Sequence, residues 1–228
     1  MLRQTFERDL RRLQDEVLAL GSMVERAVDG SVDALKRRDL AAAQRIIAGD
    51  REINAKRFAI EGEVLALIAT QQPMASDLRV LAAVLETATE LERIGDYAKG
   101  ISRISEMIGD KPLLKPLVDI PRMAEKALDM LRRALDAFVQ QDVKAARAIP
   151  KEDDEVDALY NQVYRELLTY IIADPSSMEQ ANQLLWAAHN LERAADRVTN
   201  ICERVVFTVT GEMTEMDSAD MEEGTAGV

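Results

Sequence analysis

The chain has 228 residues, of which 47% are hydrophobic and 31% are charged, so it can fill a core and is not typical of a disordered protein. Its net charge of −12 disfavours nucleic acid and anionic lipid as partners, and its single cysteine excludes an internal disulfide framework. No apolar run reaches the ~20 residues of a membrane-spanning helix, and residues 1–9 lack a signal-peptide core, so we expect a cytoplasmic protein.

Three long helices are predicted in the first half of the chain. The first covers residues 5–38, where apolar side chains recur at steps of three and four positions and form one stripe. The second covers residues 40–70 and ends at a proline, which lacks a backbone N–H and cannot continue a helix. The third follows a cap at Ser76 or Asp77 and ends near Met107.

The second half repeats this order of helices. The fourth helix covers residues 119–141, and the fifth follows Asp142, with Pro150 at the position where the second helix is expected to bend at Gly49. The sixth covers residues 178–210 and stops at a glycine. No segment of useful length alternates apolar and polar residues as a strand does, so the expected fold class is all-α.

These six helices belong to two copies of one unit. Leu-Glu-Arg-Ile-Gly-Asp at residues 91–96 returns as Leu-Glu-Arg-Ala-Ala-Asp at residues 191–196, and a phrase shared at such a period indicates a duplicated structure. We therefore predict two tandem three-helix bundles related by an internal repeat, at residues 1–110 and 119–211. Residues 212–228 contain acidic side chains but no Lys or Arg, and we predict a disordered acidic tail there.

The repeated phrase holds two acidic residues at positions i and i+4, which lie on one face of a helix. Short turns make neighbouring helices antiparallel, so counting back from each turn places acidic residues of the preceding helix at the same level. Each bundle is therefore expected to gather carboxylates from two helices into one patch. The candidate ligands are Glu92, Asp96 and Asp50 in the first bundle and Glu192, Asp196, Asp153, Asp157, Asn200 and Glu203 in the second.

Spacing alone leaves two interpretations of these patches open. Converging carboxylates repel one another unless a cation lies between them, and oxygen ligands suit Mg²⁺, Ca²⁺, Mn²⁺ or iron. The other interpretation is a helix surface on which the glutamates pair with arginines of neighbouring helices. Enzyme activity is not expected, because the chain has no phosphate-binding glycine loop, dinucleotide-binding motif or nucleophile elbow, and His189 is its only histidine.

Together with residues 72–79 and 199–203, the two repeated phrases resemble the PhoU family of phosphate-signalling regulators. The resemblance implies two tandem three-helix bundles and a role in restraining the phosphate-starvation response when phosphate is plentiful. It implies contacts with the ATPase of a phosphate ABC transporter and with a sensor histidine kinase. It also implies binding of iron or other metals, with the glutamate and the aspartate of each phrase as the leading ligands.

Three functional hypotheses follow. The first is a cytoplasmic, non-enzymatic regulator of phosphate uptake and signalling, a homodimer that reaches the inner membrane only through its protein partners. The second is a metal store or buffer built on the same helical bundles, which would hold several ions tightly. The third is an accessory protein of a different, low-affinity phosphate transporter.

Overall fold

The computed structural model describes residues 2–216, with side chains from residue 4 onward, and every regular element in this range is helical. The elements are α1 (Leu2–Arg37), α2 (Leu40–Gln71), α3 (Ala75–Ile108), α4 (Asp119–Gln140), α5 (Val143–Ala148), the 3₁₀ turn η1 (Ile149–Glu152), α6 (Asp153–Ala173), the 3₁₀ turn η2 (Pro175–Ser177) and α7 (Met178–Thr210). The predicted all-α class is therefore confirmed. None of these helices is both long enough and apolar enough to cross a membrane.

The start of the second helix in each half shows why the two halves fold alike. Asp39 accepts a hydrogen bond from the Ala42 backbone N–H at 2.9 Å, and Asp142 accepts one from the Ala145 N–H at 3.0 Å. Each carboxylate satisfies an amide that would otherwise lack a partner at the helix start. In both halves the residue before the cap has a positive φ, which ends the preceding helix sharply.

The predicted fifth helix is interrupted once along its path. α5 ends at Ala148, the η1 turn follows, and α6 begins at Asp153. Pro150 accounts for the interruption, because it has no N–H to donate to the carbonyl four residues earlier. The corresponding α2 carries Gly49 and remains one continuous helix, so the bend expected there does not interrupt it.

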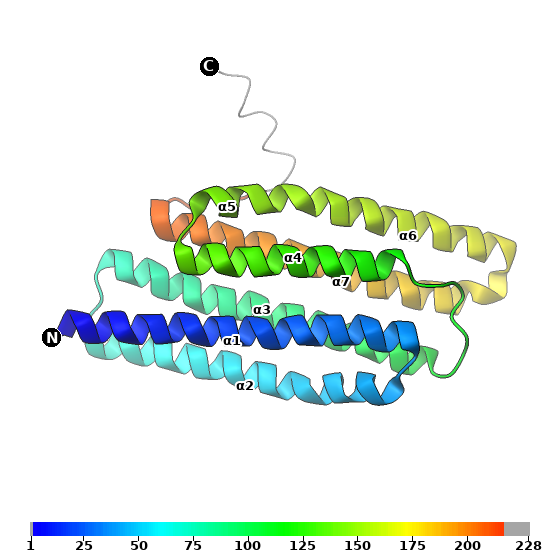
Figure 1. The fold of residues 1–228 in the computed structure, drawn as a ribbon, viewed down its shortest axis with the longest axis horizontal. Coiled ribbons are helices and arrows are strands. Elements are labelled where there is room, and N and C mark those ends of the chain that lie inside the picture. Colours follow the sequence, from blue (N-terminus) through cyan, green and yellow to red (C-terminus); the bar gives the residue numbers. More distant parts are fainter. Residues whose placement is uncertain (1, 217–228) are drawn as a thin grey trace, which may run out of the picture.

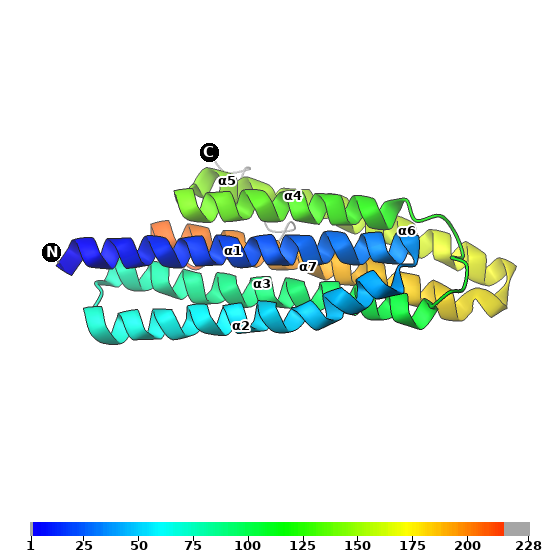
Figure 2. The ribbon, with the colours of Figure 1, turned by 60° about the horizontal axis from the view of Figure 1, so that its bottom comes forward.

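The two repeats share one hydrophobic core. α3 and α7 contact each other more extensively than any other two helices of residues 2–216, and α1 also contacts α4 of the other repeat. α2 and α6 lie on the outside, each against helices of its own repeat (Figures 1 and 2). Buried apolar residues of both repeats join in one continuous cluster, so the two bundles are fused rather than separate.

Polar side chains set the register between α3 and α7. Glu90 of α3 accepts hydrogen bonds from Arg197 at 3.4 Å and from Asn200 at 3.1 Å, and Arg204 pairs with Glu86 at 2.6 Å. The partner numbers rise on one helix as they fall on the other, so the two helices run antiparallel. The Glu90 side chain is only 12% exposed, and a carboxylate in that position depends on these partners.

The end of the described chain returns to α7. The Met216 backbone N–H donates a hydrogen bond to Glu203 Oε1 at 2.9 Å, and the Met216 side chain is buried. The predicted disordered tail therefore does not apply to Met216, because burial of this apolar side chain offsets the entropy lost in ordering it. The rest of that prediction, residues 217–228, lies outside the described residues.

Replacing Glu90 with alanine is expected to lower the free energy of unfolding by about 3 kcal/mol, because the part-buried Arg197 loses its carboxylate partner. Urea denaturation measures this difference. Glu106→Ala, at an exposed position of the same helix, is the matched control and should change stability by less than ~0.5 kcal/mol. A loss at Glu90 no larger than the loss at Glu106 would show that this network does not stabilise the joint between the repeats.

Candidate functional site

The first acidic patch lies between α2 and α3 and consists of Asp50, Glu92, Asp96 and Lys99. The Lys99 ammonium donates a hydrogen bond to Asp50 Oδ2 at 2.6 Å and lies 3.6 Å from Asp96 Oδ1. Asp50 is 5% exposed, so its charge is held in a nearly buried ion pair. The structure thus brings Asp50 of α2 to the acids of α3, together with a lysine that the sequence analysis missed. The sequence could have indicated Lys99, because it follows Asp96 by three residues and side chains at that spacing share one helix face.

The charges of the first patch are set by its own cation. Burial raises the pKa of Glu92, and the neighbouring Asp96 raises it further, whereas Arg57 lowers it. The pKa of Lys99 is raised chiefly by its hydrogen bond to Asp50, against the opposing effect of burial. Because the pKa of this ammonium is already far above neutral, Lys99 stays charged and supplies the patch with a permanent positive group.

The second acidic patch lies between α6 and α7 and consists of Asp153, Asp157, Glu192 and Asp196. Burial raises the pKa of Asp153 to about 7, and repulsion from the other three carboxylates adds to this effect. Burial is also the first cause that raises the pKa of Asp157 and of Glu192, and in both cases the charge of Asp196 comes next. The four acids therefore lie close enough to repel one another.

Two carboxylate oxygens of the second patch, Asp153 Oδ1 and Glu192 Oε2, are buried without a hydrogen-bond partner. His189 Nδ1 lies 3.2 Å from Glu192 Oε2, an arrangement that becomes an ion pair only when the imidazole is protonated. Arg193 Nε lies 3.7 Å from Asp196 Oδ2. Both of these basic groups belong to α7, the helix that carries the two acids, so neither ties α7 to α6.

Asn200 and Glu203, which the sequence analysis assigned to the same helix face, lie away from the second patch. Asn200 binds Glu90 of α3, and Glu203 accepts the hydrogen bond from the C-terminal segment. α6 begins at Asp153, and the preceding elements α5 and η1 also pack against α7. Asn200 and Glu203 therefore lie beyond the acids that α6 contributes to the patch.

Position 100 of the first repeat is a glycine, whereas the corresponding position 200 of the second repeat is an asparagine. Both residues serve the contact between α3 and α7. An ideal Cβ at Gly100 would lie 3.2 Å from the Asn190 amide nitrogen, so glycine leaves room for that side chain. At the other end of the same contact Asn200 reaches Glu90. The extra polar residue of the second repeat is thus explained by packing between repeats, which intervals along one helix do not reveal.

The two patches differ in how well they suit a metal ion. Within residues 2–216, no group of three His, Cys, Asp or Glu side chains is placed to hold one. The first patch does not fit a metal, because Lys99 already bridges its α2 and α3 acids. The second patch offers the hard oxygen donors that Mg²⁺ or Mn²⁺ prefers, including Asp153 Oδ1, which is buried without a hydrogen-bond partner. Its side chains would have to turn toward one another to bind an ion.

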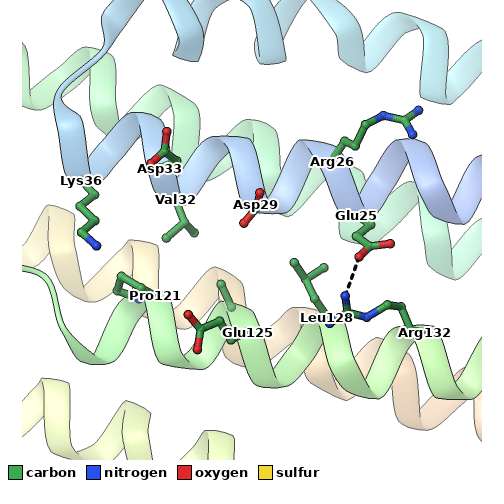
Figure 3. Close-up of a pocket in the computed structure, with 11 residues that line it drawn as sticks. Glu25, Arg26, Asp29, Val32, Asp33, Lys36, Pro121, Glu125, Leu128 and Arg132 are labelled. Carbon is green, nitrogen blue, oxygen red and sulfur yellow. Dashed lines mark hydrogen bonds and ion pairs between the residues drawn. The ribbon is translucent and has the colours of Figure 1, made fainter.

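A groove of about 500 Å³ lies between α1 and α4, where the two repeats meet (Figure 3). Val32 and Leu128 line it from the two helices, and an ion pair between Glu25 and Arg132, at 3.1 Å, lies near one end. Its lining contains both acidic and basic side chains but no Ser, Cys, His or Tyr. The sequence pattern did not predict this groove, because it forms between helices of different repeats.

Both halves of the chain match the model of the PhoU domain, at residues 17–105 and 120–205. The chain belongs to the PhoU family. It is 35% identical to the phosphate-specific transport system accessory protein PhoU homolog of Clostridium acetobutylicum over 218 residues, which cover 95% of this chain and 100% of that protein. It is 34% identical to the phosphate-specific transport system accessory protein PhoU of Escherichia coli over 207 residues, or 91% of this chain and 86% of that protein.

Solved structures of PhoU family members have the same fold. The crystal structure of PhoU from Pseudomonas aeruginosa matches with a TM-score of 0.85 and 32% identity, covering 91% of this chain and 100% of that one. The phosphate transport system regulatory protein PhoU from Streptococcus pneumoniae matches with a TM-score of 0.85 and 31% identity, covering 92% and 99%. The predicted internal repeat of two three-helix bundles is confirmed by these matches and by the two PhoU domains.

The contribution of Asp153 to stability is expected to fall as the pH rises from about 4 to about 7. Its pKa of about 7 in the folded protein lies above the ordinary value of 3.8, so the folded state binds a proton that the unfolded chain has released. This contribution is fully present below the ordinary pKa and is lost as the pH rises through the folded one. Asp153→Asn should therefore be more stable than wild type by about 1–2 kcal/mol at about pH 8, a value reduced for solvent screening of this part-exposed side chain.

Denaturant unfolding measured across this pH range checks the prediction. The advantage of Asp153→Asn should shrink toward zero near about pH 4, where Asp153 is protonated in both states. Asp154→Asn, at the exposed neighbouring position, is the matched control and should show no comparable change with pH. An advantage for Asp153→Asn that stays constant across the range would contradict the prediction.

Proposed function

We propose that this protein is a non-enzymatic, cytoplasmic regulator of phosphate uptake and phosphate-starvation signalling that works as a homodimer. It contacts the ATPase of the phosphate ABC transporter and a sensor histidine kinase, and it keeps the starvation response off while phosphate is plentiful. The observation that carries this proposal is the match of both repeats, over nearly the whole chain, to accessory proteins of the phosphate-specific transport system. The names of these relatives specify the phosphate-specific transport system, which favours this proposal over an accessory role for a different phosphate transporter.

An exposed apolar stripe on the second repeat supports a role in binding proteins. Tyr164, Leu168 and Ile172 of α6 follow one another at four-residue steps, and all three are exposed. Trp186 of α7, at 62% exposure, is another large apolar side chain on the surface of this repeat. Apolar side chains at helical spacing on a surface are typical of protein contact sites. We assign the apolar stripe (Tyr164, Leu168 and Ile172) to the contact with a protein partner.

Regulation through such a surface requires a difference in affinity. Binding shifts the kinase toward its inactive state only if this protein binds that state more tightly than the active one. Each tenfold difference in affinity supplies about 1.4 kcal/mol of bias. No reaction has to be catalysed for this effect.

Deleting the gene should raise the expression of a phosphate-starvation reporter in phosphate-rich medium, and restoring the gene should lower it again. The reason is that the kinase loses the partner that biases it toward the inactive state. Reporter fluorescence per cell is the measurement. A reporter that stays silent after deletion would contradict the regulatory proposal.

Restoration with variants tests the contact surface in the same strain. Ile172→Glu places a charge on the apolar stripe and should fail to restore repression, while its melting temperature stays close to that of wild type because the side chain is 80% exposed. Leu65→Glu, at an exposed position of α2 in the first repeat, is the matched control and should restore repression. Equal restoration by both variants would remove the stripe from the proposal.

A second proposed function is the binding of a divalent cation at the second acidic patch. It is favoured by the four carboxylates there and by Asp153 Oδ1, which is buried without a hydrogen-bond partner. Asp153, Asp157, Glu192 and Asp196 would hold the cation, which would neutralise their repulsion. Because these side chains do not already converge on one point, we propose weak, reversible binding rather than the tight binding of a metal store.

Adding Mn²⁺ should raise the melting temperature of the wild-type protein, because a ligand that binds only the folded state stabilises it. At about 100 times the dissociation constant the gain is about 2.7 kcal/mol. The double variant Glu192→Gln/Asp196→Asn should lose this increase, whereas Asp154→Asn should keep it. Scanning calorimetry with and without EDTA is the measurement, and an unchanged increase in the double variant would place the binding site elsewhere.

A further inference from the structure

The two acidic patches differ in charge at two corresponding positions. The first repeat has Asp50, Asn54, Glu92, Asp96 and Lys99 where the second has Asp153, Asp157, Glu192, Asp196 and Thr199. The first set therefore holds three carboxylates and one ammonium, whereas the second holds four carboxylates and no ammonium. Both differences make the first patch less negative than the second.

The contacts of Lys99 show what this difference does. Its ammonium binds Asp50 of α2 at 2.6 Å and lies 3.6 Å from Asp96 of α3, so one cationic group joins the acids of both helices. Asn54 donates a hydrogen bond to Asp50 Oδ2 at 3.3 Å, which adds a neutral donor where the second repeat has a carboxylate. In the second repeat Thr199 supplies no charge, and its buried hydroxyl oxygen has no hydrogen-bond partner.

We propose that Lys99 is a built-in counter-ion that takes the place of a divalent cation in the first acidic patch. The first repeat is consequently closed to divalent cations and independent of them, and the cation response of the protein belongs to the second repeat alone. The last part of this proposal rests on the proposed cation binding at the second patch. The role of Lys99 itself does not depend on it.

Burial and covalent attachment explain why a lysine can replace an ion here. Asp50 is 5% exposed, and its second oxygen, Oδ1, is buried without a partner, so this carboxylate cannot rely on water to stabilise its charge. A lysine on the facing helix is present at a high effective concentration and is never lost by dilution or chelation. Its compact ammonium is also a point charge, as a metal ion is. Without Lys99, Asp50 would be left as an unpaired charge that a mobile cation could neutralise.

Exchanging the two residues between the repeats tests the proposal in the full-length protein. The variants are Lys99→Thr, which copies the second repeat, and Thr199→Lys, which copies the first. Lys144→Thr, at an exposed position of α5, is the matched control for loss of a lysine. Melting temperatures are measured by scanning calorimetry in EDTA and in excess Mn²⁺, and calorimetric titration with Mn²⁺ measures the number of ions bound.

The proposal expects opposite results for the two exchanges. Lys99→Thr should melt about 5 °C below wild type in EDTA, and Mn²⁺ should recover most of that loss while one more ion binds than in wild type. Thr199→Lys should bind one ion fewer than wild type and lose the wild-type response to Mn²⁺. The Lys144→Thr control should match wild type in both solutions.

Other results would overturn one part or the other. If Lys99→Thr is destabilised equally with and without Mn²⁺ and binds no additional ion, Lys99 is an ordinary ion-pair residue and the proposal fails. If Thr199→Lys keeps the wild-type response to Mn²⁺, the assignment of that response to the second repeat fails. If wild type does not respond to Mn²⁺ but Lys99→Thr does, the counter-ion role of Lys99 stands and the proposed cation binding at the second patch fails.

Discussion

The antiparallel packing of α3 against α7 is the contact on which the rest of the structure depends. Both helices carry the repeated phrase, and its leucines, Leu91 and Leu191, are completely buried. Once these apolar faces meet at the centre, the acidic residues that follow each leucine must turn toward the remaining neighbour, which is an outer helix. The polar contacts of Glu90 hold the two helices in this register, because sliding either helix by one turn would leave a nearly buried carboxylate without its partners.

This arrangement places one acidic patch under each outer helix, and the two patches solve the same electrostatic problem differently. Carboxylates from two helices repel one another, and the repulsion must be offset by a cation or by protonation. In the first repeat the Lys99 ammonium offsets it permanently. In the second repeat Thr199 stands where Lys99 does in the first, and burial, together with repulsion from the neighbouring carboxylates, raises the pKa of Asp153 to about 7. The duplicated framework thus holds one patch with an ammonium between its acids and one without.

The second repeat also carries the exposed apolar stripe, and both features share α6. Asp153 begins this helix and Ile172 lies near its end, so the acidic patch and the proposed contact surface share one helix. In the first repeat the Lys99–Asp50 ion pair ties α2 to α3.

The sequence by itself determined the helices, their caps and the duplication, because each of these depends on residues close together along the chain. Apolar spacing, the capping Asp39 and Asp142, and the interruption at Pro150 act within a few residues. It also predicted the meeting of Asp50 with the acids of the third helix, since a short turn makes neighbouring helices antiparallel.

Only the tertiary structure decided that Asn200 faces the other repeat and that Met216 returns to the bundle. It alone also showed that Lys99 lies between the acids of two helices. These placements depend on which helix faces meet, and that choice is made by packing between segments about 100 residues apart, to which no local pattern is sensitive.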